Sequence, residues 1–305
     1  MLDKAFLHEN GYTFTEFSKC INELILFGES IKGEIKKYKF SDIVIALSEK
    51  SLIKIEIVEK IINDLSLTER EDFLKPKEPF DKNDVYPWKF NRRLSFNRRP
   101  LIKSDDIIIW GNRQLYHTLL FTYDIICDGR YKAISSEMKS YIGQIANNRG
   151  ECFNNQVYEK ISKFGCFIVR KMVKKINGVK IANESNQDLG DIDVLVINPK
   201  KRKIIVIETK DFSFAKSPYE LNQQYSNIFC DKDKKLCHIT RHKKRVDWIK
   251  KHVDDIIKDF SLEPFNWKVE DALVVSEPIV SNEFYNKNQK IILFSEISES
   301  NINKL

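Results

Sequence analysis

The chain has 305 residues, with 51 Lys or Arg, 44 Asp or Glu and a formal net charge of +7. This length is enough to bury a full core and predicts two domains. The mixed charge favours a polyanionic partner only modestly, and the lack of a long apolar run excludes a membrane span. The first residues, Met-Leu-Asp-Lys, show no signal-peptide pattern, so we expect a cytoplasmic protein with reduced cysteines and no membrane partner.

Residues 1–75 have a helical pattern. Thr13-Phe-Thr-Glu16 is a capping box that predicts the start of a helix, and two more helices are predicted over Ser41–Ser48 and Leu52–Leu65. A DNA-reading helix-turn-helix is an alternative for the last two, although the acidic Glu56 and Glu59 count against it. We therefore predict a helical accessory domain over residues 1–75.

Residues 76–145 are predicted to be a connection and bridging segment. Four prolines between residues 76 and 100 exclude long regular elements there, while a short strand near 107–110 and a buried helix over 115–126 follow. The stretch Lys89–Lys103 has six positive charges, no acid and interleaved aromatics, a composition that suits phosphate contact and base stacking. A solvated loop, or arginines paired with acids elsewhere in the fold, would give the same pattern. The predicted nucleic-acid contacts are Arg92, Arg93, Arg98 and Arg99.

A strand hairpin with acidic residues at one end is the most informative feature. Asp191–Ile197 and Ile204–Ile207 are both β-branched and apolar, and a polar turn separates them. Because side chains alternate along a strand, Glu208 and Lys210 emerge on one side, and a registered partner strand can place Asp193 beside them. Two carboxylates and an ammonium group then converge at the end of a buried hairpin.

Such a group of charges predicts a metal site. Carboxylates at the end of a buried apolar strand are costly unless they are paired or given a metal ion. Hard oxygen ligands favour Mg²⁺, with Mn²⁺ as a substitute. A Glu and a Lys that simply reach solvent at an edge strand are the alternative for the second strand taken by itself.

These residues resemble the PD-(D/E)xK nuclease superfamily, in which a strand hairpin carries Asp and then Asp or Glu two residues before Lys. Asp193 and Glu208-Thr209-Lys210 match this pattern, and the chain is also similar to nuclease-related domain proteins. The resemblance implies a restriction-endonuclease-like mixed sheet flanked by helices over residues 146–305, in an α+β or α/β chain. It further implies a divalent ion held by Asp193, Glu208 and the Thr209 backbone carbonyl, a water-activating Lys210, and phosphodiester hydrolysis, chiefly in DNA.

The helix before the hairpin supplies a further carboxylate in the superfamily. Relatives place a Glu three residues before the first core aliphatic of this helix, and that position is Asn154 here. We therefore predict that Glu151 completes the catalytic and metal-binding set. An ordinary solvated charge at a helix start is the alternative.

The chain after the hairpin has the elements that the resemblance requires. Helices are predicted over Pro218–Phe229 and Arg241–Asp259, and strands over Val269–Ser276 and Lys290–Ser295. The predicted nucleic-acid contacts on the two helices are Gln223, Gln224, Lys243 and Lys244. A zinc site from Cys230, Cys237, His238 and His242 is not predicted, because the spacing matches no common zinc module.

Two classes of function follow from these patterns. The first is a Mg²⁺-dependent nuclease that acts on DNA in restriction, anti-phage defence or mobile-element biology. The second is a catalytically silent nuclease-fold subunit that binds nucleic acid or acts as a scaffold in a larger complex. Nucleic acid, most plausibly DNA, is the expected partner in both, and a homodimer or a multi-protein system is compatible with either.

Overall fold

The computed structural model describes residues 1–305 except 90–91, 214, 216, 234 and 281–288. The chain folds as two compact units, Met1–Asn147 and Asn148–Leu305, so the segment predicted as a connection lies within the first unit. Among the described residues, no helix is both long enough and apolar enough to cross a membrane.

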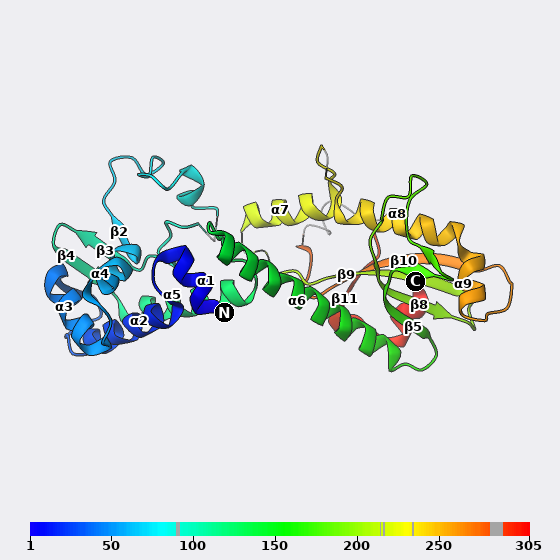
Figure 1. The fold of residues 1–305 in the computed structure, drawn as a ribbon, viewed down its shortest axis with the longest axis horizontal. Coiled ribbons are helices and arrows are strands. Elements are labelled where there is room, and N and C mark those ends of the chain that lie inside the picture. Colours follow the sequence, from blue (N-terminus) through cyan, green and yellow to red (C-terminus); the bar gives the residue numbers. More distant parts are fainter. Residues whose placement is uncertain (90–91, 214, 216, 234, 281–288) are drawn as a thin grey trace. The chain divides into compact units, whose positions relative to one another are not determined.

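Helices and a four-stranded sheet build the first unit (Figure 1). The helices are α1 (Leu2–Asn10), α2 (Phe14–Glu29), α3 (Phe40–Ser51), α4 (Ile55–Asp64), the 3₁₀ turn η1 (Lys82–Asp84), α5 (Asn112–Cys127) and the start of α6 (Ser136–Ser162). The strands are β1 (Lys36–Lys39), β2 (Ser66–Thr68), β3 (Leu101–Ser104) and β4 (Ile107–Trp110), in the order β1-β4-β3-β2. Only β4 was predicted, because the other strands are short and lack a clear period of two.

The predicted capping box at the start of α2 is confirmed. The Thr13 hydroxyl accepts a hydrogen bond from the Glu16 backbone N–H at 3.0 Å, and the Glu16 carboxylate accepts one from the Thr13 N–H at 2.7 Å. α2 then buries Phe17, Ile21 and Leu24 in the core of the first unit.

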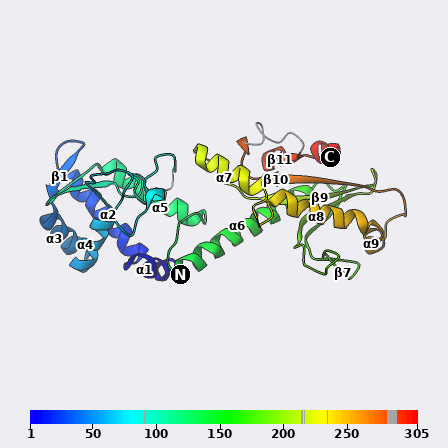
Figure 2. The ribbon, with the colours of Figure 1, turned by 90° about the horizontal axis from the view of Figure 1, so that it is seen from above.

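A five-stranded mixed sheet forms the centre of the second unit. Its strands are β5 (Ile168–Val173), β8 (Ile192–Asn198), β9 (Lys203–Lys210), β10 (Lys268–Val275) and β11 (Ile291–Leu293), in the order β11-β10-β9-β8-β5. β5, β8 and β9 are antiparallel neighbours, whereas β10 runs parallel to β9 and β11 parallel to β10. A separate small hairpin pairs β6 (Lys175–Ile176) with β7 (Val179–Lys180) (Figure 2).

Helices cover both faces of this sheet. One face packs against the C-terminal part of α6 and against α11 (Glu299–Lys304), which follows the 3₁₀ turn η2 (Phe294–Glu296). The other face packs against α7 (Pro218–Phe229), α8 (His238–Lys251) and α9 (Val253–Asp259). The predicted α+β class, with a mixed sheet flanked by helices in the C-terminal half, is confirmed.

The predicted elements of the second unit are found with shifted bounds. The hairpin and the two later strands are β8, β9, β10 and β11, and α7 has the predicted bounds. The single helix predicted over Arg241–Asp259 is wrong in two respects, because the helix starts at His238 and is interrupted at His252. The helix before the hairpin, α6, already starts at Ser136, so Glu151 lies inside it and not at its start.

We expect Thr13→Ala to lower the free energy of unfolding of the first unit by about 1 kcal/mol, because the Glu16 backbone N–H at the start of α2 loses its hydroxyl acceptor. Thr13→Ser, which keeps the hydroxyl, is the matched control and should cost only a few tenths of that amount. Urea denaturation followed by circular dichroism measures both. Equal losses in the two variants would contradict a role for the cap.

Candidate active site

β8 and β9 bring the predicted acidic residues together. Val194 lies opposite Ile207 in the antiparallel register, so Asp193 and Glu208 occupy the next position on the two strands. The Glu208 side chain is only 5% exposed, whereas Asp193 is half-buried. The hairpin therefore places one fully buried and one partly buried carboxylate side by side, as the sequence predicted.

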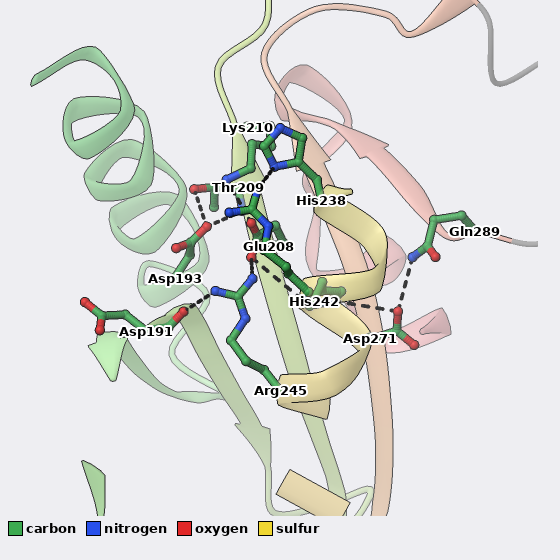
Figure 3. Close-up of polar contacts among 11 residues, drawn as sticks. Asp191, Asp193, Glu208, Thr209, Lys210, His238, His242, Arg245, Asp271 and Gln289 are labelled. Atoms are coloured by element: carbon green, nitrogen blue, oxygen red, sulfur yellow. Dashed lines mark hydrogen bonds and ion pairs between the residues drawn. The ribbon is translucent and has the colours of Figure 1, made fainter. Parts of the chain in front are cut away.

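Two cations neutralise Glu208 (Figure 3). Lys210 Nζ lies 2.8 Å from its Oε1, and Arg245 of α8 donates a short hydrogen bond from Nη2 to its Oε2. The other end of the guanidinium, Nη1, donates to the Asp191 carbonyl oxygen at 2.6 Å. Burial by itself raises the pKa of Glu208, but the charges of Lys210 and Arg245 outweigh burial and hold this pKa below its usual value. Glu208 is therefore ionised and fixed in position.

Asp193 has a different environment. Its Oδ2 accepts hydrogen bonds from the Thr209 backbone N–H at 2.8 Å and the Thr209 hydroxyl at 3.2 Å. Among the described residues, no Lys, Arg or His nitrogen forms an ion pair with it within 4.0 Å. Burial and the negative charge of Glu208 raise the pKa of Asp193. Within the described part of the chain, Asp193 thus lacks a neutralising cation, and a cation beside it would relieve its repulsion with Glu208.

Two histidines of α8 face the same region. His242 is 1% exposed, with Nδ1 3.8 Å from Glu208 Oε2 and Nε2 3.7 Å from Asp271 Oδ2. Burial lowers the pKa of His242, and burial together with the charge of Lys210 lowers the pKa of His238 to about 4. Both rings are therefore neutral near neutral pH. Gln289 holds Asp271 from the other side at 3.1 Å (Figure 3).

The donor set fits a divalent ion of the Mg²⁺ type. In the described part of the chain, no three His, Cys, Asp or Glu side chains are grouped so that they could hold a metal ion. Mg²⁺ nevertheless binds through one or two carboxylates and retains several waters, which matches the pair Asp193 and Glu208. That the Thr209 carbonyl is a ligand stays a prediction.

The helix carboxylate is less well supported by its surroundings. Glu151 is exposed in the middle of α6, so it is a solvated charge, as the alternative held, but it does not lie at a helix start. Asn154, one turn further on, is 7% exposed, and its Oδ1 has no hydrogen-bond partner among the described residues. The catalytic role predicted for Glu151 stays a prediction, and Asn154 is the buried polar residue of this part of the helix.

The four predicted arginine contacts lie in the first unit and make contacts within it. Arg93 binds the Asp84 carboxylate through Nε at 2.8 Å and Nη2 at 2.6 Å. Arg92 donates to backbone carbonyl groups, whereas Arg98 and Arg99 lie over aromatic rings. For Arg93 the alternative of pairing with an acid in the fold is what the structure shows. The aromatic Phe90 of this stretch lies outside the described residues.

The predicted contacts on α7 and α8 belong to the second unit. Lys243 and Lys244 are exposed on α8, and Gln224 of α7 has a buried Oε1 without a partner in the part of the chain described. Gln223 is half-buried. Lys244 lines a groove of about 620 Å³ together with Lys180, Trp248, Lys251 and His252. The structure thus leaves Lys243 and Lys244 accessible to a partner.

Sequence reasoning missed Arg245 and His242 as parts of this site. Lys243 and Lys244 were predicted as contacts because they lie off the apolar stripe of α8. Arg245 and His242 lie within this stripe, next to Val246 and Ile249. A polar side chain at a buried helix position needs a partner on the facing element. Their position inside the apolar stripe was the signal that could have revealed them.

Comparison with known proteins identifies the family of this chain. A family model described as "Anti-phage protein Upx-like" matches residues 4–287, which is nearly the whole chain. The chain belongs to the Upx-like anti-phage protein family. Its membership supports a role in defence against phage and says nothing of the chemistry of this site. No curated protein and no solved structure matches the chain.

We expect Asp193→Asn to stabilise the protein at about pH 7. Because the pKa of Asp193 is higher in the folded than in the unfolded state, its ionisation lowers stability above the folded pKa, and this loss disappears as the pH falls towards 3.8. The variant should therefore melt about 2 °C or more above the wild type at neutral pH, with a gap that narrows in acid. Calorimetric melting temperatures across this pH range test this. A lower melting temperature at neutral pH would contradict the charge deficit.

Arg245→Met should lower the free energy of unfolding of the second unit by about 3–5 kcal/mol, because a buried carboxylate loses one of its two cations. In the double variant Arg245→Met, Glu208→Met no buried charge is left unpaired, so we expect most of the loss to be recovered. Lys243→Met, on the exposed face of the same helix, is the matched control. Urea unfolding of the wild type, Arg245→Met, Glu208→Met and the double variant gives the coupling energy, and additive losses would refute the pairing.

Proposed function

We propose that the chain is a divalent-metal-dependent nuclease that acts in anti-phage defence, with DNA as its first expected substrate. The observation that carries the proposal is the environment of Asp193, a carboxylate beside ionised Glu208 that has a raised pKa and no cation of its own among the described residues. A divalent cation beside Asp193 would relieve its repulsion with Glu208, and Lys210 contacts Glu208 at the same place. Membership of the Upx-like family supports the defence role.

The arrangement of the second unit also supports a likeness to PD-(D/E)xK nucleases. The second unit begins within helix α6, and the three antiparallel strands β5, β8 and β9 follow it. The helices α7 and α8 come next, and strand β10 then runs parallel to β9. This is the order of the superfamily core, and the acidic hairpin is its second and third strands. The likeness rests on topology and on the residues Asp193, Glu208 and Lys210 alone.

Each residue of the site has a definite task in this proposal. Asp193 and Glu208 would hold the ion, which when bound would polarise a phosphoryl oxygen and lower the pKa of its water. Arg245 keeps Glu208 ionised and oriented. Lys210, with a side chain 26% exposed, offers its ammonium group to the negative charge that develops on the phosphoryl oxygens. His242 stays neutral and adds no competing positive charge.

One observation favours the second class, a nuclease-fold subunit without turnover. Both oxygens of Glu208 already bind cations, so an incoming metal ion competes with Lys210 and Arg245. In that case the site is a structural ion-pair network, and the exposed Lys243 and Lys244 would serve nucleic-acid binding only. Metal binding separates the two classes, because the silent subunit needs no ion.

We expect the purified protein to cleave labelled nucleic acid in Mg²⁺ or Mn²⁺ and not in EDTA. Duplex and single-stranded DNA and RNA should be compared, since the geometry of the site does not determine which nucleic acid is cleaved. Asp193→Asn and Lys210→Met should each reduce the cleavage rate by about 100-fold or more, because each removes a charge that acts on the phosphate or the ion.

Lys163→Met, an exposed lysine of the same unit, is the matched control and should cleave at the wild-type rate. Calorimetric titration with Mg²⁺ provides a second readout, in which the wild type binds and Asp193→Asn does not. Cleavage that persists in both site variants would sink the nuclease assignment. No Mg²⁺ binding and no cleavage of any polymer would favour the silent subunit.

A further inference from the structure

A cavity in the first unit has a strong excess of positive charge. It encloses about 230 Å³ and is formed by α1, α4, the segment after η1 and the segment between α5 and α6. Five basic side chains line it, against two acidic ones. The basic residues are Lys60, Arg93, Arg98, Arg99 and Lys132.

The two acids of the cavity are already engaged. The Glu9 carboxylate accepts hydrogen bonds from the Ile134 backbone N–H at 2.9 Å and from the Ser135 N–H at 2.7 Å. Asp64 forms an ion pair with Lys60 at 2.9 Å. Neither acid forms an ion pair with Arg93, Arg98, Arg99 or Lys132 within the described part of the chain. The acidic residues of the cavity wall therefore do not neutralise all of its basic residues.

Three cations are left without a carboxylate partner. Arg93 binds Asp84, but among the described residues no carboxylate lies within 4.0 Å of the charged nitrogens of Arg98, Arg99 or Lys132. Arg98 Nη1 is buried and has no hydrogen-bond partner in the described part of the chain. Buried guanidinium donors that are neither paired nor solvated are costly, and an anion in the cavity would satisfy them.

Aromatic rings hold two of these guanidinium groups in place. Arg98 Cζ lies 5.0 Å from the centre of the Tyr131 ring, and Arg99 Cζ lies 4.9 Å from the centre of the Phe80 ring. Contact with a ring orients a guanidinium group without using its N–H donors. Of these donors, Arg99 Nη1 reaches the Ser66 carbonyl oxygen at 3.2 Å. Arg98 Nη1 is the buried donor that has no partner among the described residues, and it is available to a ligand.

The electrostatics agree with this geometry. Burial lowers the pKa of Arg99, and burial together with the positive charges of Lys89 and Arg98 lowers the pKa of Lys132. Asp64 raises the pKa of Arg99 and Asp84 raises that of Lys132, but burial and the neighbouring cations outweigh these two carboxylates. A bound anion would remove this repulsion.

We propose that this cavity binds the phosphate group of a small phosphorylated molecule. Two guanidinium forks and an ammonium group match a phosphate monoester dianion better than a single carboxylate, because a phosphate offers more acceptor oxygens and more negative charge. The volume is below the roughly 300–1,000 Å³ of sites for drug-sized ligands, so the ligand is no larger than a mononucleotide. The site is independent of the proposed nuclease activity.

Calorimetric titration of the full chain tests the proposal with inorganic phosphate, ribose 5-phosphate, adenosine 5′-monophosphate and adenosine. We expect the phosphorylated probes to bind and adenosine not to bind. Arg98→Gln and Arg99→Gln should each weaken binding by about 10-fold or more, because each removes a charge-assisted contact. Lys37→Gln, an exposed change on β1, is the matched control and should bind as the wild type does.

The choice of probes separates the sources of phosphate. Equal binding of inorganic phosphate and the two phosphate esters supports the site and means that free phosphate is sufficient for binding. Tighter binding of the two esters supports the site with an organic phosphate as its ligand. If Arg98→Gln or Arg99→Gln fails to fold, Lys132→Gln keeps the test open, because Lys132 is not part of the apolar core of the first unit. Binding that is unchanged in the folded variants, or no binding of any phosphorylated probe, would overturn the proposal.

Discussion

The neutralisation of one buried carboxylate organises the second unit. Glu208 lies near the end of β9, directly after the buried residues Ile204–Ile207, and an isolated charge there would be strongly unfavourable. Lys210 on the same strand and Arg245 on α8 supply the compensating charges. Because the Arg245 guanidinium also binds the Asp191 carbonyl, one side chain links α8 to both β8 and β9. The position of α8 over the sheet therefore depends on an ion pair as well as on apolar packing.

The same arrangement leaves the neighbouring carboxylate unbalanced. Lys210 and Arg245 both approach Glu208, and within the described part of the chain Asp193 accepts hydrogen bonds from Thr209 alone. A protein that maximised its stability would pair or remove such a charge, so this unfavourable group is where a functional role is best sought. The first unit has the opposite imbalance, since Arg98, Arg99 and Lys132 surround a cavity without a free acid. Each unit thus concentrates charge of one sign where a ligand of the other sign would fit.

The family match spans both units, so the anti-phage role belongs to a chain that contains both features. The first unit had been predicted as a helical accessory domain and a connection, which gave it no task of its own. Its sheet brings the segments after α4 and before α5 side by side through the pairing of β2 with β3. Of the arginines predicted as nucleic-acid contacts, Arg93 pairs with Asp84 and lines the cavity together with Arg98 and Arg99, and their contact with nucleic acid stays a prediction.

The sequence by itself determined the hairpin and the residues that it brings together. The β-branched, apolar runs of β8 and β9 and the polar turn between them are local information, so the approach of Asp193, Glu208 and Lys210 could be predicted, as could the capping box at Thr13 and the bounds of α7. Only the tertiary structure decided which charges pair. Arg245 lies 37 residues from Glu208, and their contact depends on the rotation of α8 about its axis and on its packing over the sheet. Ion pairing over such a separation has no periodic signature, because the three-dimensional packing sets it.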